Sequence, residues 1–293
     1  MAPPYSMRRV LPALLVALAA LLGSCSTVRL SYEHADWLLA RMAGRYVELD
    51  NTQARVLKAR LGALHAWHRS EELPQYTRGL EEAADRIARG LTRQDVHWAV
   101  DELRERGQAL SEQAGEDLVP LLRTLSERQL DEAARELNQD NVEFAKSYLS
   151  GDPARRAARR AAWLYDKLAD WIGPLTQEQR ARVDAFVAAF PDSVALRLEE
   201  RRRYQAVLLK LVREYRSSPQ FEARLRAFLA DPAAGRAQAN QSAALKVEEG
   251  FVDLLLALDR SLTPAQRKAA ITKLRAYAAD FRQLSASQSV AAN

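Results

Sequence analysis

The sequence predicts an all-α fold, and three observations lead to this prediction. Isoleucine occurs only three times in the 293 residues, against a background rich in alanine, leucine, arginine and glutamate, a composition that favours helix over sheet. Apolar residues recur at three- and four-residue spacing over long stretches. Capping side chains stand at the expected helix starts. The hydrophobic content of 48% is sufficient for a sizeable core.

The first predicted element is a long amphipathic helix over 32–68. This stretch contains no proline, and its large apolar residues, Trp37, Leu57 and Trp67 among them, recur every three or four positions. The residue before a proline is pushed out of the helical region. We therefore expect this helix to end near Leu73-Pro74.

The next helix runs over 75–89 and stops at Gly90, and Thr92 with Asp95 can cap the one after it. The remaining helices are predicted, in chain order, over 92–114, 117–124, 126–149, 153–171, 176–189, 192–216, 219–230, 236–260 and 263–285. Four starts place a capping residue before a proline: Asp152-Pro153, Ser218-Pro219, Asp231-Pro232 and Thr263-Pro264. About ten helices joined by short turns pack best as one or two antiparallel bundles.

The N-terminal segment has the pattern of an export signal. Met7-Arg8-Arg9 is basic, 10–22 is apolar apart from one proline, and small residues follow. The apolar run is shorter than the ~20 residues that a membrane-spanning helix needs. Leu22-Gly23-Ser24-Cys25 resembles the lipobox of bacterial lipoproteins. The resemblance implies cleavage between Ser24 and Cys25 and a lipid on Cys25; the alternative is an ordinary signal peptide with a chance cysteine.

A lipid on Cys25 would hold the mature chain on a membrane without crossing it. By the same resemblance, Ser26 in place of the aspartate that marks inner-membrane retention implies the periplasmic face of the outer membrane. The tether between the anchor and the first helix is about six residues long and reaches no more than ~20–25 Å. We therefore expect the folded body to lie close to the lipid surface.

The predicted organisation is a leader (1–24), the lipidated cysteine with its tether (25–31), a helical domain (32–285) and a frayed tail (286–293). No long linker interrupts the helical domain, and the candidate internal boundary lies near 150–174. With a single cysteine, the chain cannot form an internal disulfide or a zinc site built on several thiolates.

A short motif, Leu-[Ser/Thr]-x-x-Gln, occurs three times, at 125–129, 175–179 and 262–266. In a capping box the hydroxyl accepts the N3 amide hydrogen and the glutamine side chain reaches back to the N-cap amide. The unequal offsets argue against a repeat of fixed period. The motif also resembles the LTxxQ signature of Spy/CpxP-type periplasmic proteins, which are helical chaperones and stress adaptors. Helix capping alone and kinship with that family remain alternatives.

A second resemblance extends over most of the chain. Its elements are Tyr32 with Asp36-Trp37-Leu38, the stretch from Trp67-His68-Arg69 to Tyr76, and the motifs at 125–129, 173–179 and 262–267. In this order they are similar to a family of uncharacterised proteobacterial lipoproteins. The resemblance implies a lipidated helical domain, and no established activity comes with it.

Two clusters are candidate partner-binding sites. Trp67, His68 and Arg69 are followed by Glu71 and Glu72, where the alternative is a core tryptophan with cations at a helix end. Arg155, Arg156, Arg159 and Arg160 lie on one side of a helix, where the alternative is a solvated face and the functional interpretation is contact with anionic headgroups or acidic clients.

Signatures of enzymes and of metal sites are absent from the sequence: there is no G-x-S-x-G, P-loop, Rossmann glycine run, EF-hand loop or HExxH. Acids and bases alternate along the chain, so the pI near 9.4 does not indicate a nucleic-acid site. We expect no catalysis, cofactor or metal, and a lipoprotein that acts as a binding or structural subunit for an envelope partner. The alternative is a Spy/CpxP-like chaperone with unfolded clients.

Overall fold

The computed structural model describes residues 32–231, 233 and 236–286, and within these ranges every regular element is helical. The all-α prediction is confirmed. Among the described helices, none combines the length and the hydropathy that a membrane crossing requires. The leader, Cys25, the tether and residues 287–293 lie outside the described residues.

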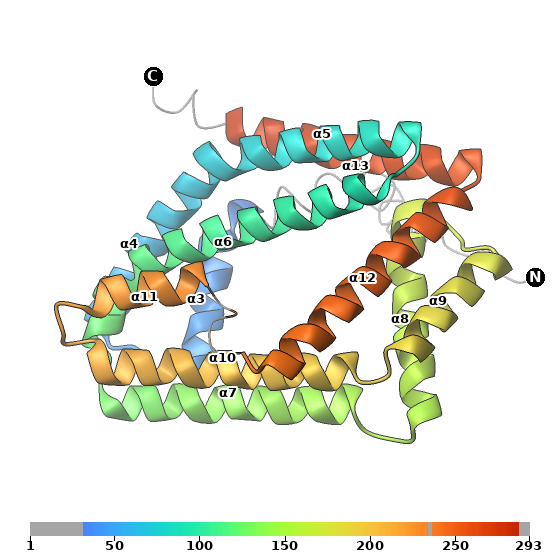
Figure 1. The fold of residues 1–293 in the computed structure, drawn as a ribbon. Helices are drawn as coiled ribbons and strands as arrows, with labels where there is room; N and C mark the ends of the chain where they lie inside the picture. The colour runs from blue at the N-terminus through green and yellow to red at the C-terminus, as the bar shows by residue number, and fades with distance from the viewer. Residues whose placement is uncertain (1–31, 232, 234–235, 287–293) are drawn as a thin grey trace, which may run out of the picture.

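The helices follow one another with short connections (Figure 1). They are α3 (Ala35–Tyr46), α4 (Asn51–Trp67), the π-helical turn η2 (His68–Glu72), α5 (Leu73–Arg89), α6 (Arg93–Thr124), α7 (Glu127–Tyr148), α8 (Pro153–Ile172), α9 (Gln177–Ala189), α10 (Ser193–Tyr215), α11 (Phe221–Ala230), α12 (Gln238–Arg260) and α13 (Pro264–Ala286).

The helices form an open frame (Figure 1). Two antiparallel pairs, α5 with α13 and α7 with α10, make opposite sides, and α6 and α12 run obliquely between them. The buried apolar side chains form several separate clusters at the corners rather than one centre. Apolar packing where the helices cross therefore stabilises the frame.

The two halves of the chain repeat one packing pattern. In the first half α4 contacts α3 and α6, and α3 contacts α7; in the second, α9 contacts α8 and α12, and α8 contacts α13. The halves also exchange helices, because α5 of the first packs on α13 of the second and α10 of the second packs on α7 of the first. The short helix α11, which packs on α6 and α10, has no counterpart between α5 and α6 in the described part of the first half.

The prediction of one helix over 32–68 is wrong, because the chain leaves the helical conformation over 47–50. Asp50 is the reason. Its carboxylate accepts hydrogen bonds from the amides of Thr52 and Gln53, both at 2.8 Å, and starts α4 as a new helix. Apolar periodicity continues across this break, so it could not reveal the break.

The predicted helix end near Pro74 is also wrong. The chain continues from α4 into α5 through the π turn η2, in which the Leu73 amide bonds to the carbonyl of His68. A proline lacks the amide hydrogen and its ring collides with the carbonyl four residues earlier. The wider π turn removes that conflict, so the helical conformation continues past Pro74.

Three further boundaries differ from the prediction. The segments 92–114 and 117–124 are one helix, α6, in which Gly115 allows the Leu229 side chain to approach where a Cβ would collide with it. Pro219 does not begin a helix, since α11 starts at Phe221, and α12 starts at Gln238 rather than directly after Asp231. Ser218 and Asp231 instead accept hydrogen bonds from amides two residues ahead, which are turn interactions.

Candidate functional site

The Leu-[Ser/Thr]-x-x-Gln motifs bring two buried glutamines face to face. Gln179 and Gln266 exchange two amide hydrogen bonds, of 2.9 Å and 3.0 Å. Each side-chain oxygen also accepts from its own N-cap amide, at Thr176 or Thr263. Each amide nitrogen also donates to the turn before the partner helix, at Ser261 or Pro174. Every donor and acceptor of both side chains is therefore used.

The same arrangement occurs in the first half, and one member of it escaped the sequence analysis. Gln129 pairs with Gln53 through bonds of 2.7 Å and 3.2 Å, and their other amide hydrogens reach the carbonyls of Glu48 and Thr124. Gln53 belongs to Leu49-Asp50-x-x-Gln53, in which aspartate replaces the hydroxyl residue. Accepting any capping residue at the second position would have revealed the motif.

The two pairs differ in sequence separation, which is 76 residues between Gln53 and Gln129 and 87 residues between Gln179 and Gln266. The second half carries α11 between α10 and α12, and its α12 has 23 residues against 32 in the corresponding α6, so the two separations need not agree. The unequal offsets of the motif therefore fit a duplicated unit with one inserted helix. In both halves the motif starts a helix, and its glutamine joins that N-terminus by hydrogen bonds to the N-terminus of a second helix.

The first candidate cluster, Trp67-His68-Arg69, lies at the π turn and is occupied by the chain itself. Tyr32 Oη lies 2.9 Å from His68 Nδ1, the Tyr32 ring lies 4.6 Å from the His65 ring, and the Arg69 guanidinium covers the Tyr32 ring at 5.4 Å. Trp67 is half-buried beside His68. The cluster thus holds Tyr32, just before α3, against the π turn.

Buried ionisable groups gather around this turn. Glu72 is buried, with one carboxylate oxygen 3.4 Å from Arg106. Among the described residues, its other oxygen has no hydrogen-bond partner, and neither does His65 Nε2. Burial raises the pKa of Glu72. Among the described residues no three His, Cys, Asp or Glu side chains are placed to hold a metal ion.

Acidification should destabilise the π turn through its histidines. Burial lowers the pKa of His68, with His65 adding to the effect, and burial and then Arg69 lower the pKa of His65. Below about pH 6.5 the unfolded chain therefore takes up protons more readily than the folded one, and stability falls. The raised pKa of Glu72 acts in the opposite direction, because its stabilising contribution is lost as the pH rises.

We expect urea unfolding to show a smaller loss of stability between about pH 7.5 and 5 for His65→Phe/His68→Phe than for the wild type. His97→Phe is the matched control, because His97 lies on α6 beside Glu249 and outside the cluster. Equal losses in the double variant and the wild type would show that these histidines do not set the pH dependence.

The second candidate cluster borders a groove of about 710 Å³ formed by the end of α7, by α8, and by the α9–α10 junction. We call it the Arg–Trp groove. Its apolar wall includes Phe144, Tyr148, Trp163, Phe186 and Phe190, and its basic residues are Arg156, Arg159, Arg160 and Arg197. The side chains of Trp163 and Tyr148 are 54% and 48% exposed. Large aromatic rings left open to solvent at one concave site are uncommon in monomeric proteins.

Backbone carbonyls hold three of these arginines in place. Arg156 donates to Gly151 at 2.8 Å and Arg159 to Ser150 at 2.7 Å, both just after α7, whereas Arg160 donates to Val187 and Pro191 at the end of α9. Arg155 is the exception, with its side chain 81% exposed beside Asp152. Arg155 and Arg159 are exposed, whereas Arg156 and Arg160 are half-buried, so the four arginines do not form a uniformly solvated face.

The groove carries an excess of positive charge, with four arginines and one carboxylate, Asp166, among its lining residues. Within the described ranges, none of its four arginines has a carboxylate within ion-pair distance, although Asp166 also lines the groove. Burial lowers the pKa of Arg160, and the nearby Arg156 lowers it further against an opposing contribution from Asp192. Arginine stays charged at neutral pH even so, and the site can accept an anion.

A family model described as "Family of unknown function (DUF6279)" matches residues 45–238, well over half of the chain. The chain belongs to this family. No curated protein and no solved structure matches it.

The DUF6279 match includes every residue that lines the Arg–Trp groove, the π turn and three of the four paired glutamines. It leaves out Tyr32, most of α3, Gln266 and α13. The fourth glutamine and the helix that completes the frame therefore lie beyond the region that the DUF6279 match defines.

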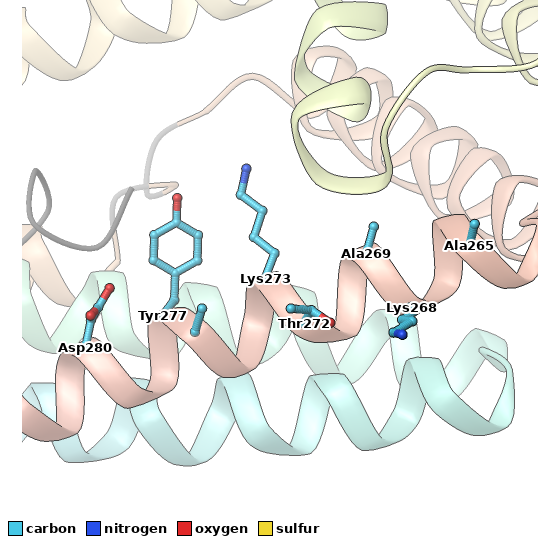
Figure 2. A pocket seen from close by; sticks show the side chains of 8 residues that line it. Ala265, Lys268, Ala269, Thr272, Lys273, Tyr277 and Asp280 are labelled. Atoms are coloured by element: carbon cyan, nitrogen blue, oxygen red, sulfur yellow. The ribbon is translucent and has the colours of Figure 1, made fainter. Parts of the chain in front are cut away.

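A second open surface lies on α13, outside the DUF6279 match (Figure 2). This surface is a shallow pocket with a volume of about 590 Å³. It is lined by Ala265, Lys268, Ala269, Thr272, Lys273, Ala276, Tyr277 and Asp280. Lys273 and Tyr277 project from it toward α8, where Trp171 lies 5.8 Å from the Tyr277 ring and 5.1 Å from the Lys273 ammonium. The sequence analysis did not find this surface, because its small residues on one helix face look like ordinary core packing.

Proposed function

We propose that the mature protein is a lipoprotein anchored through Cys25 to the periplasmic face of the outer membrane, where it acts without catalysis as a binding or structural subunit. The export pattern and the lipobox resemblance support the anchor. The family match adds no activity, because DUF6279 has no known function.

The observation that carries this proposal is the exposed face of α3. Its inner face, with Ala40 and Ala43, packs toward α4, whereas Trp37, Leu38 and Met42 are exposed on the opposite side. Arg41 lies over the Trp37 ring at 5.8 Å. Tryptophan, aliphatic side chains and arginine together are typical of helices that lie at a lipid–water interface.

The position of α3 in the chain strengthens this interpretation. The helix begins at Ala35, ten residues after the proposed lipid attachment site. An extended chain of that length spans no more than about 35 Å. An acyl anchor on Cys25 would therefore keep the open face of α3 near the bilayer, and each contact would reinforce the other.

The prediction from this proposal concerns Cys25→Ser. Without the thiol no thioether lipid can form, so we expect the variant to remain uncleaved or to leave the membrane fraction, and to take up no radiolabelled palmitate. Trp37→Ser/Leu38→Ser/Met42→Ser is the companion variant, which keeps the anchor and should still incorporate palmitate.

These two variants separate the anchor from the helix face. A Cys25→Ser protein that matures normally and stays in the outer-membrane fraction would overturn the lipoprotein assignment. If the α3 variant leaves the membrane no more easily than the wild type in high salt or carbonate, α3 adds nothing to attachment, and the anchor alone remains supported.

A Spy/CpxP-like chaperone is the second candidate function, and the surface on α13 favours it. An alanine-lined face with Lys268 and Lys273 beside it (Figure 2) is an open apolar surface with basic edges, which suits unfolded acidic or apolar segments. Crosslinking in envelopes combined with an aggregation assay distinguishes the two. One stoichiometric partner without suppression of aggregation supports the subunit; many clients with suppression support the chaperone.

A further inference from the structure

We propose that the Arg–Trp groove is a binding site for one anionic single-chain lipid, whose carboxylate or phosphate head lies at Arg156 and Arg159 and whose aliphatic chain lies along Phe144, Trp163 and Phe190. This goes beyond the proposed function, and it does not depend on lipid attachment at Cys25.

The size of the groove selects the class of ligand. Its volume of about 710 Å³ is in the range of sites that hold one small molecule, about 300–1,000 Å³. Helices surround it: α7 and α8 contribute one part of the wall, and the α9–α10 junction contributes the other. A folded protein partner would cover this region, whereas a single extended molecule can enter it.

The arginines supply an anion site that is formed before the ligand arrives. The hydrogen bonds from Arg156 Nη1 to Gly151 and from Arg159 Nη2 to Ser150 fix both guanidiniums near the α7–α8 turn. A guanidinium has five N–H donors, so each arginine keeps donors for a ligand. Guanidinium groups match the oxygen geometry of carboxylates and phosphates.

The wall beyond the arginines suits a hydrocarbon chain. The rings of Phe144 and Tyr148 lie 4.8 Å apart and those of Phe186 and Phe190 lie 5.2 Å apart, and both pairs border the groove. The Phe190 ring occupies its place because Gly250 of α12 has no Cβ, which would otherwise collide with it. The groove therefore presents two aromatic ring pairs beside its arginines.

An acidic peptide fits the groove less well. A peptide carries a backbone donor and acceptor at every residue, and these need partners when water is removed. Most of the groove wall is helical, with its backbone groups already paired, and apart from arginine its polar groups are the side chains of Ser147, Asp166 and Ser193, the Tyr148 hydroxyl and the Trp163 indole N–H. Methylene groups need no such partners, so a lipid chain can lie there at no polar cost.

The test is photocrosslinking of the full-length protein in membranes with a dodecanoate that carries a diazirine at the end of its chain. We expect saturable crosslinks that map by mass spectrometry to 144–148, to Trp163 and to Phe190. Unlabelled dodecanoate and dodecyl phosphate should compete, and uncharged dodecyl maltoside and inorganic phosphate should compete at least tenfold more weakly.

Matched variants on the same helix make the test specific. Arg156→Gln/Arg159→Gln and Trp163→Ala should each weaken crosslinking at least tenfold, whereas Arg155→Gln and Trp171→Ala should leave it unchanged, because Arg155 and Trp171 do not line the groove. Trp163 is exposed, so its variant keeps the fold, and far-ultraviolet circular dichroism verifies this.

Three outcomes would overturn the proposal. Crosslinks confined to α3 would indicate contact with the bilayer only. Equal competition by dodecyl maltoside would show that the arginines select no anion. An acidic peptide that displaces the probe more strongly than dodecanoate does would make the groove a peptide site.

Discussion

Gln179→Ala should lower the free energy of unfolding by about 3–5 kcal/mol, because each buried polar group left without a partner costs about 1–3 kcal/mol. Gln179 is 0% exposed. Without its side chain, the Gln266 side chain, the Thr176 amide and the Ser261 carbonyl each lose a hydrogen-bond partner. Urea unfolding of the purified protein measures the change. Thr176→Ala should cost only about 0.5–2 kcal/mol, the ordinary value of an N-cap.

A double-mutant cycle tests whether the two glutamines act as a unit. Gln179→Leu/Gln266→Leu should cost clearly less than the sum of the two single variants, since the double change removes both members of the buried pair and leaves neither amide facing an apolar side chain. Additive losses, or a smaller loss for Gln179→Ala than for Thr176→Ala, would mean that the pair is an ordinary capping box with no role in joining helices.

Phe221→Ala should cost about 3–5 kcal/mol, the usual range for truncating a fully buried phenylalanine. Phe221 is the first residue of α11 and is completely buried among Val119, Leu130 and Leu225. Arg123 lies 5.3 Å above its ring and donates to the carbonyls of the preceding turn, so the cavity would also loosen this contact.

Phe228→Ala is the matched control on the same helix. Phe228 is half-buried beside Tyr204, with ring centroids 4.7 Å apart, so its truncation should cost much less than that of Phe221. Thermal unfolding followed by circular dichroism ranks the two. A loss at Phe221 no larger than at Phe228 would show that α11 is peripheral and that its cluster does not hold the frame together.

Local chemistry made most helix boundaries predictable from the sequence. The hydrogen bonds that start α6, α7 and α9 lie within four residues, so Thr92, Ser126 and Thr176 identify those starts without knowledge of the rest of the fold. Asp50 obeys the same chemistry and was missed because its helix start lies inside a continuous apolar pattern. At Pro74 the prediction was wrong for the opposite reason. The π turn before it removes the clash between the proline ring and the backbone carbonyl that normally ends a helix.

The site was less predictable because its parts come from distant segments. The arginine cluster on α8 was visible in the sequence, but the carbonyls that hold Arg160 belong to the end of α9 and the aromatic wall comes partly from α7. Likewise, the glutamines were identified as helix caps, and only the fold shows that they meet in pairs. Periodicity predicts which face of a helix is buried and cannot predict what it is buried against.

The exchange of helices between the halves has a consequence for how the chain acquires its structure. Contacts between α5 and α13 join residues far apart in the chain, as in the approach of Thr77 to the carbonyl of Ala278, 201 positions later. Contacts between residues so far apart form slowly, because closing the long intervening loop costs conformational entropy before any contact contributes a favourable free energy. The side of α5 that carries Leu73 and Ala84 is buried in the folded protein, and it therefore stays exposed to solvent until α13 has been synthesised. The order of synthesis thus makes the burial of this side of α5 depend on α13, the last helix to be made.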